Sequence, residues 1–337
     1  MKMSTGGTNE IYKSGKHPLK ANLVLTGIIV LALIAGFHWP DSADDSLYPV
    51  PKVKIYVPSK PGGTTDATAR AFARSLERHT GVKTVVINQT AGGGTVAVAS
   101  VASAPADGGS LLVFHAMLHV AHGTGRQEQS ADDLTPLATI SRATDVYVVR
   151  TGAPFDSLDG LLNHSVNHDL TIASQLGGTT QLKASALANA AAQRGGSLRP
   201  VAMGSMAQRL TSLLGEQVDV SIVDLKTARQ YLDAGTIKPL AVISDQRDPF
   251  EPGWPTAIEQ GVDINLAQVN ELYAPGNMSI ATRTHLDGLL AAALQDPELE
   301  LDLARVKQAL EYRDSESAKK FIQAEALQVS RILDQGL

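Results

Sequence analysis

The chain has 337 residues, 43% of them hydrophobic, and is long enough for two packed domains because single cores rarely exceed about 250–300 residues. Its formal net charge is -5 and its basic residues form no block, so the composition gives no electrostatic support for a nucleic-acid partner. It contains no cysteine, which excludes disulfides, thiolate metal sites and a lipid-modified N-terminal cysteine.

The N-terminal segment has the order of an export signal. Lys13, Lys16 and Lys20 precede an apolar stretch at 23–37, and a polar, acidic linker follows. The apolar stretch suits a long signal core and is just short of a spanning helix, and no clear cleavage site follows it. We therefore expect residues 1–43 to be an export signal or an N-terminal membrane anchor. Both alternatives predict a periplasmic globular part, and the second tethers it to the inner membrane.

Strands and helices alternate in the first part of the globular region. β-Branched runs predict strands at 53–57, 84–87, 110–114 and 145–150. Alanine-rich segments between the strands predict helices at about 66–79 and 95–104. This alternation is typical of an α/β fold with mostly parallel sheets flanked by helices.

A second alternating block runs from Leu170 to about Ser244. Its predicted strands lie at 170–173, 218–223 and 238–243, and its predicted helices lie near 180–193, 205–214 and 226–234. Prolines interrupt the chain after this block, and the tail from Ala281 to Leu337 is predicted to be helical.

Two glycine-rich turns, at 61–66 and 91–95, each follow a predicted strand and lead into a predicted helix. Glycine lets the backbone turn sharply and approach a ligand closely. The first N–H groups of the following helix have no intrahelical partners and lie at the positive end of its dipole. Two such turns in one cleft would bind a carboxylate or phosphate, although each turn alone is also ordinary in an α/β protein.

Five segments, in this order and spacing, are similar to a known family: YPVPKVKIYVPSKPGGTTDATARAFA, VVINQTAGGGTVA, APADGGSLLV, LLGEQVDVSIVDL and IKPLAVISDQRDPFEPGWPTAIEQGVDI. Over roughly residues 48–325 the chain resembles the extracytoplasmic solute receptors of tripartite tricarboxylate transporters, the Bug-type receptors. The resemblance implies a two-domain class II periplasmic-binding fold, or Venus flytrap. The chain would cross between domains near 149–150 and 269–270, with domain 1 formed by 48–150 plus 270–337 and domain 2 by 151–269.

The resemblance also implies a ligand site. In that family the backbone N–H groups of the first two turns and ordered waters hold a ligand carboxylate, while a third turn in the other domain closes on its far end. Matched residue by residue, the three turns and the pocket floor are here Ser59, Lys60, Gly62, Gly63, Thr64 and Asp66; Ala91, Gly92, Gly93, Gly94 and Thr95; Ser174, Gly177, Gly178, Thr179 and Thr180; and Asp224.

The chain departs from the family pattern at three places. Ser59 stands where the family usually has an aromatic residue, Gln181 where it has a histidine, and Ala202 with Met203 where it has an aromatic–lysine pair. Each change removes a stacking or cationic contact, so the ligand is not identified. Lys60 would restore a positive charge, although a lysine in a turn is often solvated.

Two other classes of site have partial sequence support. Gly92, Gly94 and Ala97 match a dinucleotide-binding pattern, but the glycines start late after the strand and no acidic residue follows at the required distance. His115, His119 and His122 would share a helical face, but no neighbouring carboxylate completes a metal-binding set.

The sequence therefore predicts a binding protein without catalysis, cofactor or metal. We expect a monomeric, exported receptor that captures a small organic anion, with a carboxylate favoured, in an interdomain cleft. It would deliver this ligand to a tripartite tricarboxylate-type permease. The alternatives are a ligand sensor that presents its closed form to a membrane signalling partner and, with less support, a dinucleotide-dependent enzyme.

Overall fold

The computed structural model describes residues 48–334. The predicted export signal or anchor at 1–43 lies outside these residues. Within them, no helix has both the length and the apolar character needed to cross a membrane.

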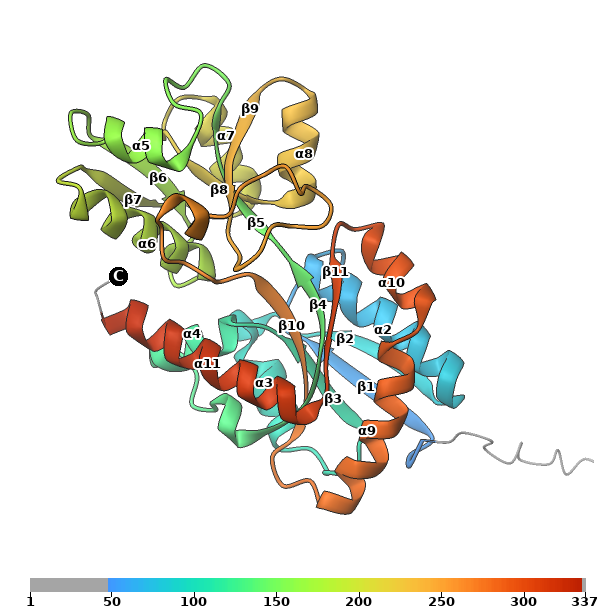
Figure 1. Ribbon diagram of the computed structural model, residues 1–337. Coiled ribbons are helices and arrows are strands. Elements are labelled where there is room, and N and C mark those ends of the chain that lie inside the picture. Colours follow the sequence, from blue (N-terminus) through green and yellow to red (C-terminus); the bar gives the residue numbers. More distant parts are fainter. Residues whose placement is uncertain (1–47, 335–337) are drawn as a thin grey trace, which may run out of the picture. The chain divides into compact units, whose positions relative to one another are not determined.

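A six-stranded sheet forms the centre of what we call the large lobe (Figure 1). Its strands, in spatial order, are β11 (Ala309–Arg313), β4 (Leu134–Ala143), β10 (Gln268–Pro275), β3 (Ser110–Phe114), β1 (Lys52–Val57) and β2 (Lys83–Asn88). Its helices are α2 (Thr64–Thr80), α3 (Thr95–Ala102), α4 (Met117–Gly123), α9 (Ile280–Leu294), α10 (Pro297–Ala304) and α11 (Ser315–Asp334). The short 3-10 turns η1 (Ala91–Gly94) and η2 (Ala131–Asp133) belong to the same lobe.

Two smaller sheets form the small lobe. The first has the strand order β8 (Ser221–Asp224), β5 (Asp145–Arg150), β9 (Ile237–Val242), and the second pairs β6 (Leu170–Ser174) with β7 (Leu198–Ala202). The helices of this lobe are α5 (Leu158–His164), α6 (Thr179–Gln193), α7 (Met206–Leu214) and α8 (Leu225–Asp233), and η3 (Ile258–Gln260) is a short 3-10 turn.

Side-chain periodicity explains the elements next to the predicted site. In β1 the buried residues alternate with more exposed ones, Val53, Ile55 and Val57 being buried, as expected for a strand with one face on the core. The following helix, α2, ends at Gly81, which adopts the left-handed conformation with φ 73°. The first part of the chain therefore folds as its local sequence predicts.

The sheets are mixed, with more antiparallel pairing than the sequence analysis expected. Parallel pairing joins β1 to β2 and β3, and β6 to β7. The pairs that involve β4, β5, β10 and β11 are antiparallel. The physical reason is that β10 returns from the small lobe and inserts between β3 and β4 in the opposite direction.

The C-terminal tail is not entirely helical, which corrects the prediction for 281–337. Strand β11, with the sequence ALEYR, separates α10 from α11 and pairs with β4 at the edge of the large sheet. All its residues are half-buried, so buried and exposed side chains do not alternate along it. The segment therefore lacks the two-residue pattern from which a strand is predicted. Strand β4 was missed as well, because Pro136 and several polar residues obscure its pattern.

The chain passes between the lobes at two places. Strand β4 ends at Ala143 and β5 begins at Asp145 in a different sheet, and the chain returns to the large sheet at β10. Strand β5, which was assigned to domain 1 by resemblance, thus pairs with small-lobe strands. The division of the chain into two separately moving domains remains a prediction.

Helix α10 provides a test of the large-lobe core. Leu303 is fully buried in this core, whereas Leu301, on the same helix, is 59% exposed. Leu303→Ala should lower the free energy of unfolding by about 2–5 kcal/mol, because it removes packed atoms and leaves a cavity. Leu301→Ala should change it by no more than about 0.5 kcal/mol. Urea denaturation measures both, and equal losses would contradict this placement of α10.

Candidate functional site

The first glycine turn joins β1 to α2. Gly62 has φ 80°, a conformation that favours glycine, and its N–H donates to Oδ2 of Asp66 at 2.8 Å. Gly63 is the N-cap residue of α2, and no side chain caps this helix. The N–H groups at the start of α2 are thus left for another acceptor.

Asp66 braces this turn and does not face an open cleft. Its side chain is 2% exposed and accepts hydrogen bonds from Arg70 Nε at 2.9 Å and Asn88 Nδ2 at 2.9 Å. Burial raises the pKa of Asp66, but the hydrogen bonds from Arg70, Gly62 and Asn88 outweigh it and hold the pKa below its ordinary value of 3.8. The carboxylate therefore stays ionised at neutral pH and fixes the turn.

Ser59 is the residue of the first turn whose surroundings point to a ligand. Its hydroxyl is buried and has no hydrogen-bond partner among the described residues. A buried hydroxyl without a partner is unfavourable, so a bound acceptor or water is expected to satisfy it. Lys60, in contrast, is exposed.

The second glycine turn lies directly beside the first. Three successive glycines, Gly92, Gly93 and Gly94, have φ values of 63°, 71° and 104°. A Cβ on Gly94 would lie 2.5 Å from Cβ of Pro58, the residue that follows β1. Glycine is therefore required here for the two turns to approach each other. Gly94 is also the N-cap residue of α3, again without a capping side chain.

The third turn joins β6 to α6 in the small lobe. Gly177 has φ 68°, and its N–H donates to Oε1 of Gln181 at 2.6 Å. Oγ1 of Thr180 accepts from the N–H of Gln175 at 2.9 Å, so this side chain stabilises the turn. Gly178 is the N-cap residue of α6, and no side chain caps this helix either. Gln181, which stands where the family has a histidine, thus stabilises the conformation of the third turn by accepting this hydrogen bond.

The remaining helices show that uncapped starts are not general in this chain. Capping side chains accept backbone N–H groups at the starts of six helices: Ser157 for α5, Ser205 for α7, Asp224 for α8, Ser279 for α9, Asp296 for α10 and Asp314 for α11. At α4 the N–H of Met117 donates to Nδ1 of His115 at 3.3 Å. The three helices that follow the glycine turns are instead capped by glycine, which leaves their positive ends open to an anion.

A cavity of about 350 Å³ joins the first turn to the small lobe. Its lining includes Gly62, Gly63 and Thr64 from the first turn, Asp224 and Lys226 from the start of α8, and Lys307 and Gln308 from the loop before β11. The structure thus brings Asp224 to the first turn, where its own carboxylate caps α8 through the N–H of Thr227 at 2.8 Å. The second and third turns do not contribute to this lining.

Arg126 connects the third turn to the large lobe. It follows α4, and its guanidinium donates to the carbonyl oxygen of Gly177. This places a positive charge from one lobe at the glycine turn of the other. No sequence pattern singled out Arg126, because it is an isolated arginine in a polar loop.

Two further residues that the sequence analysis missed hold the first turn in place. Nδ2 of Asn88, at the end of β2, donates to the carbonyl of Ser59 at 3.0 Å. Nε2 of Gln308 donates to the carbonyl of Thr64 at 3.0 Å, while its Oε1 accepts from Thr68 at 2.6 Å. Gln308 is 240 residues or more from these partners, so no local sequence signal could have identified it.

Comparison with known proteins agrees with the fold and identifies the family. A model of the "Tripartite tricarboxylate transporter family receptor" matches residues 68–336. The chain is 27% identical to the protein BugT of Bordetella pertussis over 246 residues, which are 71% of this chain and 73% of BugT. The structure of a TctC solute-binding protein from Polaromonas, 22% identical, aligns with a TM-score of 0.76 over 86% of this chain and 99% of that one.

A third relative has been solved with a ligand. This protein of R. palustris, solved with adipate, is 26% identical and has a TM-score of 0.71. The alignment covers 85% of this chain and 97% of that one.

Because the ionised carboxylate of Asp66 braces the first turn, we expect the stability of the fold to depend on pH. The folded-state pKa of Asp66 is lowered, so its carboxylate contributes stability above pH 3.8, and the contribution is lost as the pH falls through the folded pKa. Asp66→Asn should therefore lower Tm at pH 7, and the difference from the natural protein should shrink towards pH 3. The exposed Asp263→Asn is the control. A Tm difference that is constant with pH would contradict the ionised brace.

Proposed function

The chain belongs to the tripartite tricarboxylate transporter receptor family, and we propose that it captures a small dicarboxylate between its lobes and presents it to the permease of such a transporter. Members of this family are periplasmic substrate-binding receptors rather than enzymes. The dinucleotide-dependent enzyme considered from Gly92, Gly94 and Ala97 is therefore dropped.

The observation that best supports this proposal is the set of three helix starts capped by glycine. An anion at a helix start gains about 0.3–1 kcal/mol when exposed and up to about 2 kcal/mol when partly buried. Hydrogen bonds to a charged acceptor add about 1.5–3 kcal/mol each. Two adjacent starts, α2 and α3, would thus suffice to bind one carboxylate without a cationic side chain, with Ser59 as an additional donor.

A second carboxylate would complete the ligand. The third turn, at the start of α6, presents a further uncapped helix, and Arg126 lies against its Gly177. A ligand with an anionic group at each end would therefore contact the large lobe first and the small lobe on closure. The relative solved with adipate, a six-carbon dicarboxylate, supports this class of ligand.

Calorimetry tests the ligand class directly. We expect the purified full-length chain to bind adipate or a dicarboxylate of similar length, more tightly than the matching monocarboxylate by at least about tenfold, because the monocarboxylate leaves one helix start unused. Equal affinity for mono- and dicarboxylates would contradict the two-ended site. No binding of any carboxylate would contradict the proposed function.

Substitution of the glycines tests which atoms hold the anion. Gly63→Val should reduce the affinity at least about 100-fold, because its side chain would cover the start of α2. Gly93→Val should do the same at α3. Lys60→Ala should cost about tenfold, consistent with one partly solvated charge.

Two glycines outside the turns are matched controls. Gly195 shares with Gly93 a positive φ (76° and 71°) and open space around its Cα, so Gly195→Val carries a similar backbone strain without touching the site. Gly215 is the control for Gly63, because a Cβ at either position would lie 3.2 Å from a backbone carbonyl oxygen, that of Thr211 or that of Lys60. Normal binding in both site variants, with loss in Lys60→Ala, would show that a side-chain cation holds the ligand.

A further inference from the structure

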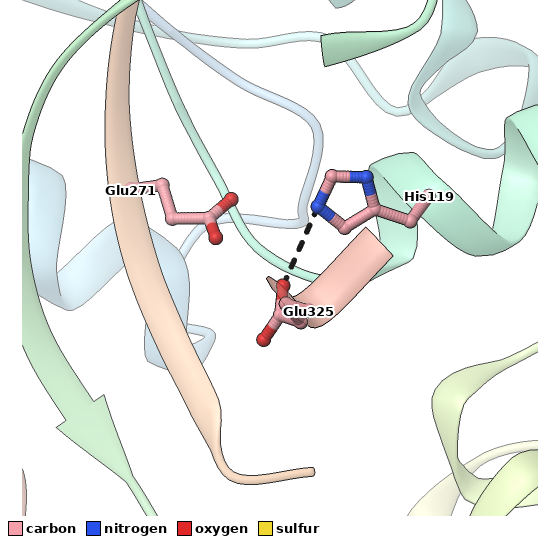
Figure 2. A group of neighbouring side chains, drawn as sticks. All are labelled: His119, Glu271 and Glu325. Carbon is pink, nitrogen blue, oxygen red and sulfur yellow. Dashed lines mark ion pairs between the residues drawn. The ribbon is translucent and has the colours of Figure 1, made fainter. Parts of the chain in front are cut away.

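Three buried side chains from distant parts of the sequence meet inside the large lobe (Figure 2). His119 comes from α4, Glu271 from β10 and Glu325 from α11, and their ligand-type atoms all lie within 4.8 Å of one another. We propose that His119, Glu271 and Glu325 form a binding site for one divalent transition-metal ion, with Zn²⁺ the best match.

Burial is the first observation that supports a metal ion. The three residues are only 7%, 0% and 6% exposed. Within the described chain, Nε2 of His119, Oε1 of Glu271 and Oε2 of Glu325 have no hydrogen-bond partner. Buried polar atoms are nearly always paired, so three such atoms that face one another need a common partner, which is either a proton shared by the two carboxyl groups or a cation.

The geometry needs little adjustment to hold an ion. In a tetrahedral zinc site, with bonds of about 2.0–2.1 Å, neighbouring ligand atoms are about 3.3–3.5 Å apart. Nε2 of His119 and Oε2 of Glu325 are 3.5 Å apart already. Glu271 would move inward by a side-chain rotation, since its atoms lie within 4.8 Å of the other two.

The neighbouring tyrosine orients one ligand. The hydroxyl of Tyr273 donates to Oε2 of Glu271 at 2.6 Å, which leaves Oε1 to face the other two residues. Such hydrogen bonds from outside the ligand set are typical of metal sites, where they fix the orientation of a carboxylate.

Charge balance also favours a cation. The carboxylates of Glu271 and Glu325 are buried side by side in the large lobe. Arg313 and Lys183 are the cations whose charges act on Glu325, and Arg313 acts on Glu271 as well. A divalent ion between the two carboxylates would neutralise both.

The chemical types of the three ligand atoms indicate which metal ion would bind. One imidazole nitrogen and two carboxylate oxygens suit Zn²⁺, or a similar first-row ion, better than Ca²⁺ or Mg²⁺, which take six or more oxygen ligands. Cavities lie next to two of the three residues. One of about 590 Å³ is lined by His119, and another of about 170 Å³ is lined by Glu325.

The expected role of the ion is structural. It would tie α11 to α4 and to β10, the strand that returns from the small lobe. This site lies apart from the glycine turns, so its existence does not depend on the proposed function.

The test uses the purified full-length chain after removal of metals by a chelator. Addition of ZnCl₂ should raise Tm by about 5 °C at saturating concentration, and elemental analysis should find one zinc per chain. Mg²⁺ and Ca²⁺ should produce no comparable shift. His119→Ala and Glu325→Gln should each weaken zinc binding at least tenfold in calorimetry, whereas Glu316→Gln, an exposed carboxylate on the same helix, should bind normally.

Two outcomes would overturn the proposal. One is that zinc does not shift Tm of the natural protein, which would mean that the cluster holds only protons. The other is that the shift persists in Glu325→Gln and Glu271→Gln, which would place the zinc elsewhere. These glutamine variants keep the side-chain shape, and circular dichroism checks that they fold. If His119→Ala does not fold, these two variants decide the question.

Discussion

The proposed ligand site depends on which groups accept hydrogen bonds from the free backbone N–H groups at the helix starts. Six helices of the described chain begin at a serine or aspartate whose side chain accepts backbone N–H groups, and α2, α3 and α6 begin at glycine without such an acceptor. Unpaired N–H groups at a helix start cost stability unless water or a ligand accepts from them. Under the proposed function, these three helix starts, which lack a side-chain acceptor, would receive the anion.

Such a site works only if its backbone is held rigidly. Gln308 and Asn88 hold the first turn from two directions, and Asp66 adds an ionised acceptor inside the turn. Gly94 lets the second turn pack on Pro58. A ligand that binds a rigid set of donors loses less free energy to ordering than one that must organise them. Under the proposed function, the buried polar groups around the first turn would therefore favour binding without touching the ligand.

Local sequence predicted the parts of the fold whose periodicity is strong, and a family resemblance predicted the architecture. Strands β1, β3 and β5 and helix α6 lie within a residue or two of their predicted positions, because their patterns are clear. Strands β4, β7, β10 and β11 were missed, and for β4 and β11 the reason is that neighbours far away in the sequence set their burial. A similar limit applies to side-chain clusters. The glycine turns can be read from local sequence, whereas the contacts of Gln308 and the meeting of His119 with Glu271 and Glu325 arise only in the folded chain.

The most direct test of the account is a measurement of the backbone N–H groups themselves. In ¹⁵N-labelled protein, saturation with a dicarboxylate that calorimetry has shown to bind should shift the amide protons at the starts of α2 and α3 downfield more than any others, because these donors would bond to a carboxylate. The start of α6 should respond to the second carboxylate. The largest shifts at Lys226 and Lys307, with little change at the glycine turns, would contradict the claim that helix starts hold the anion.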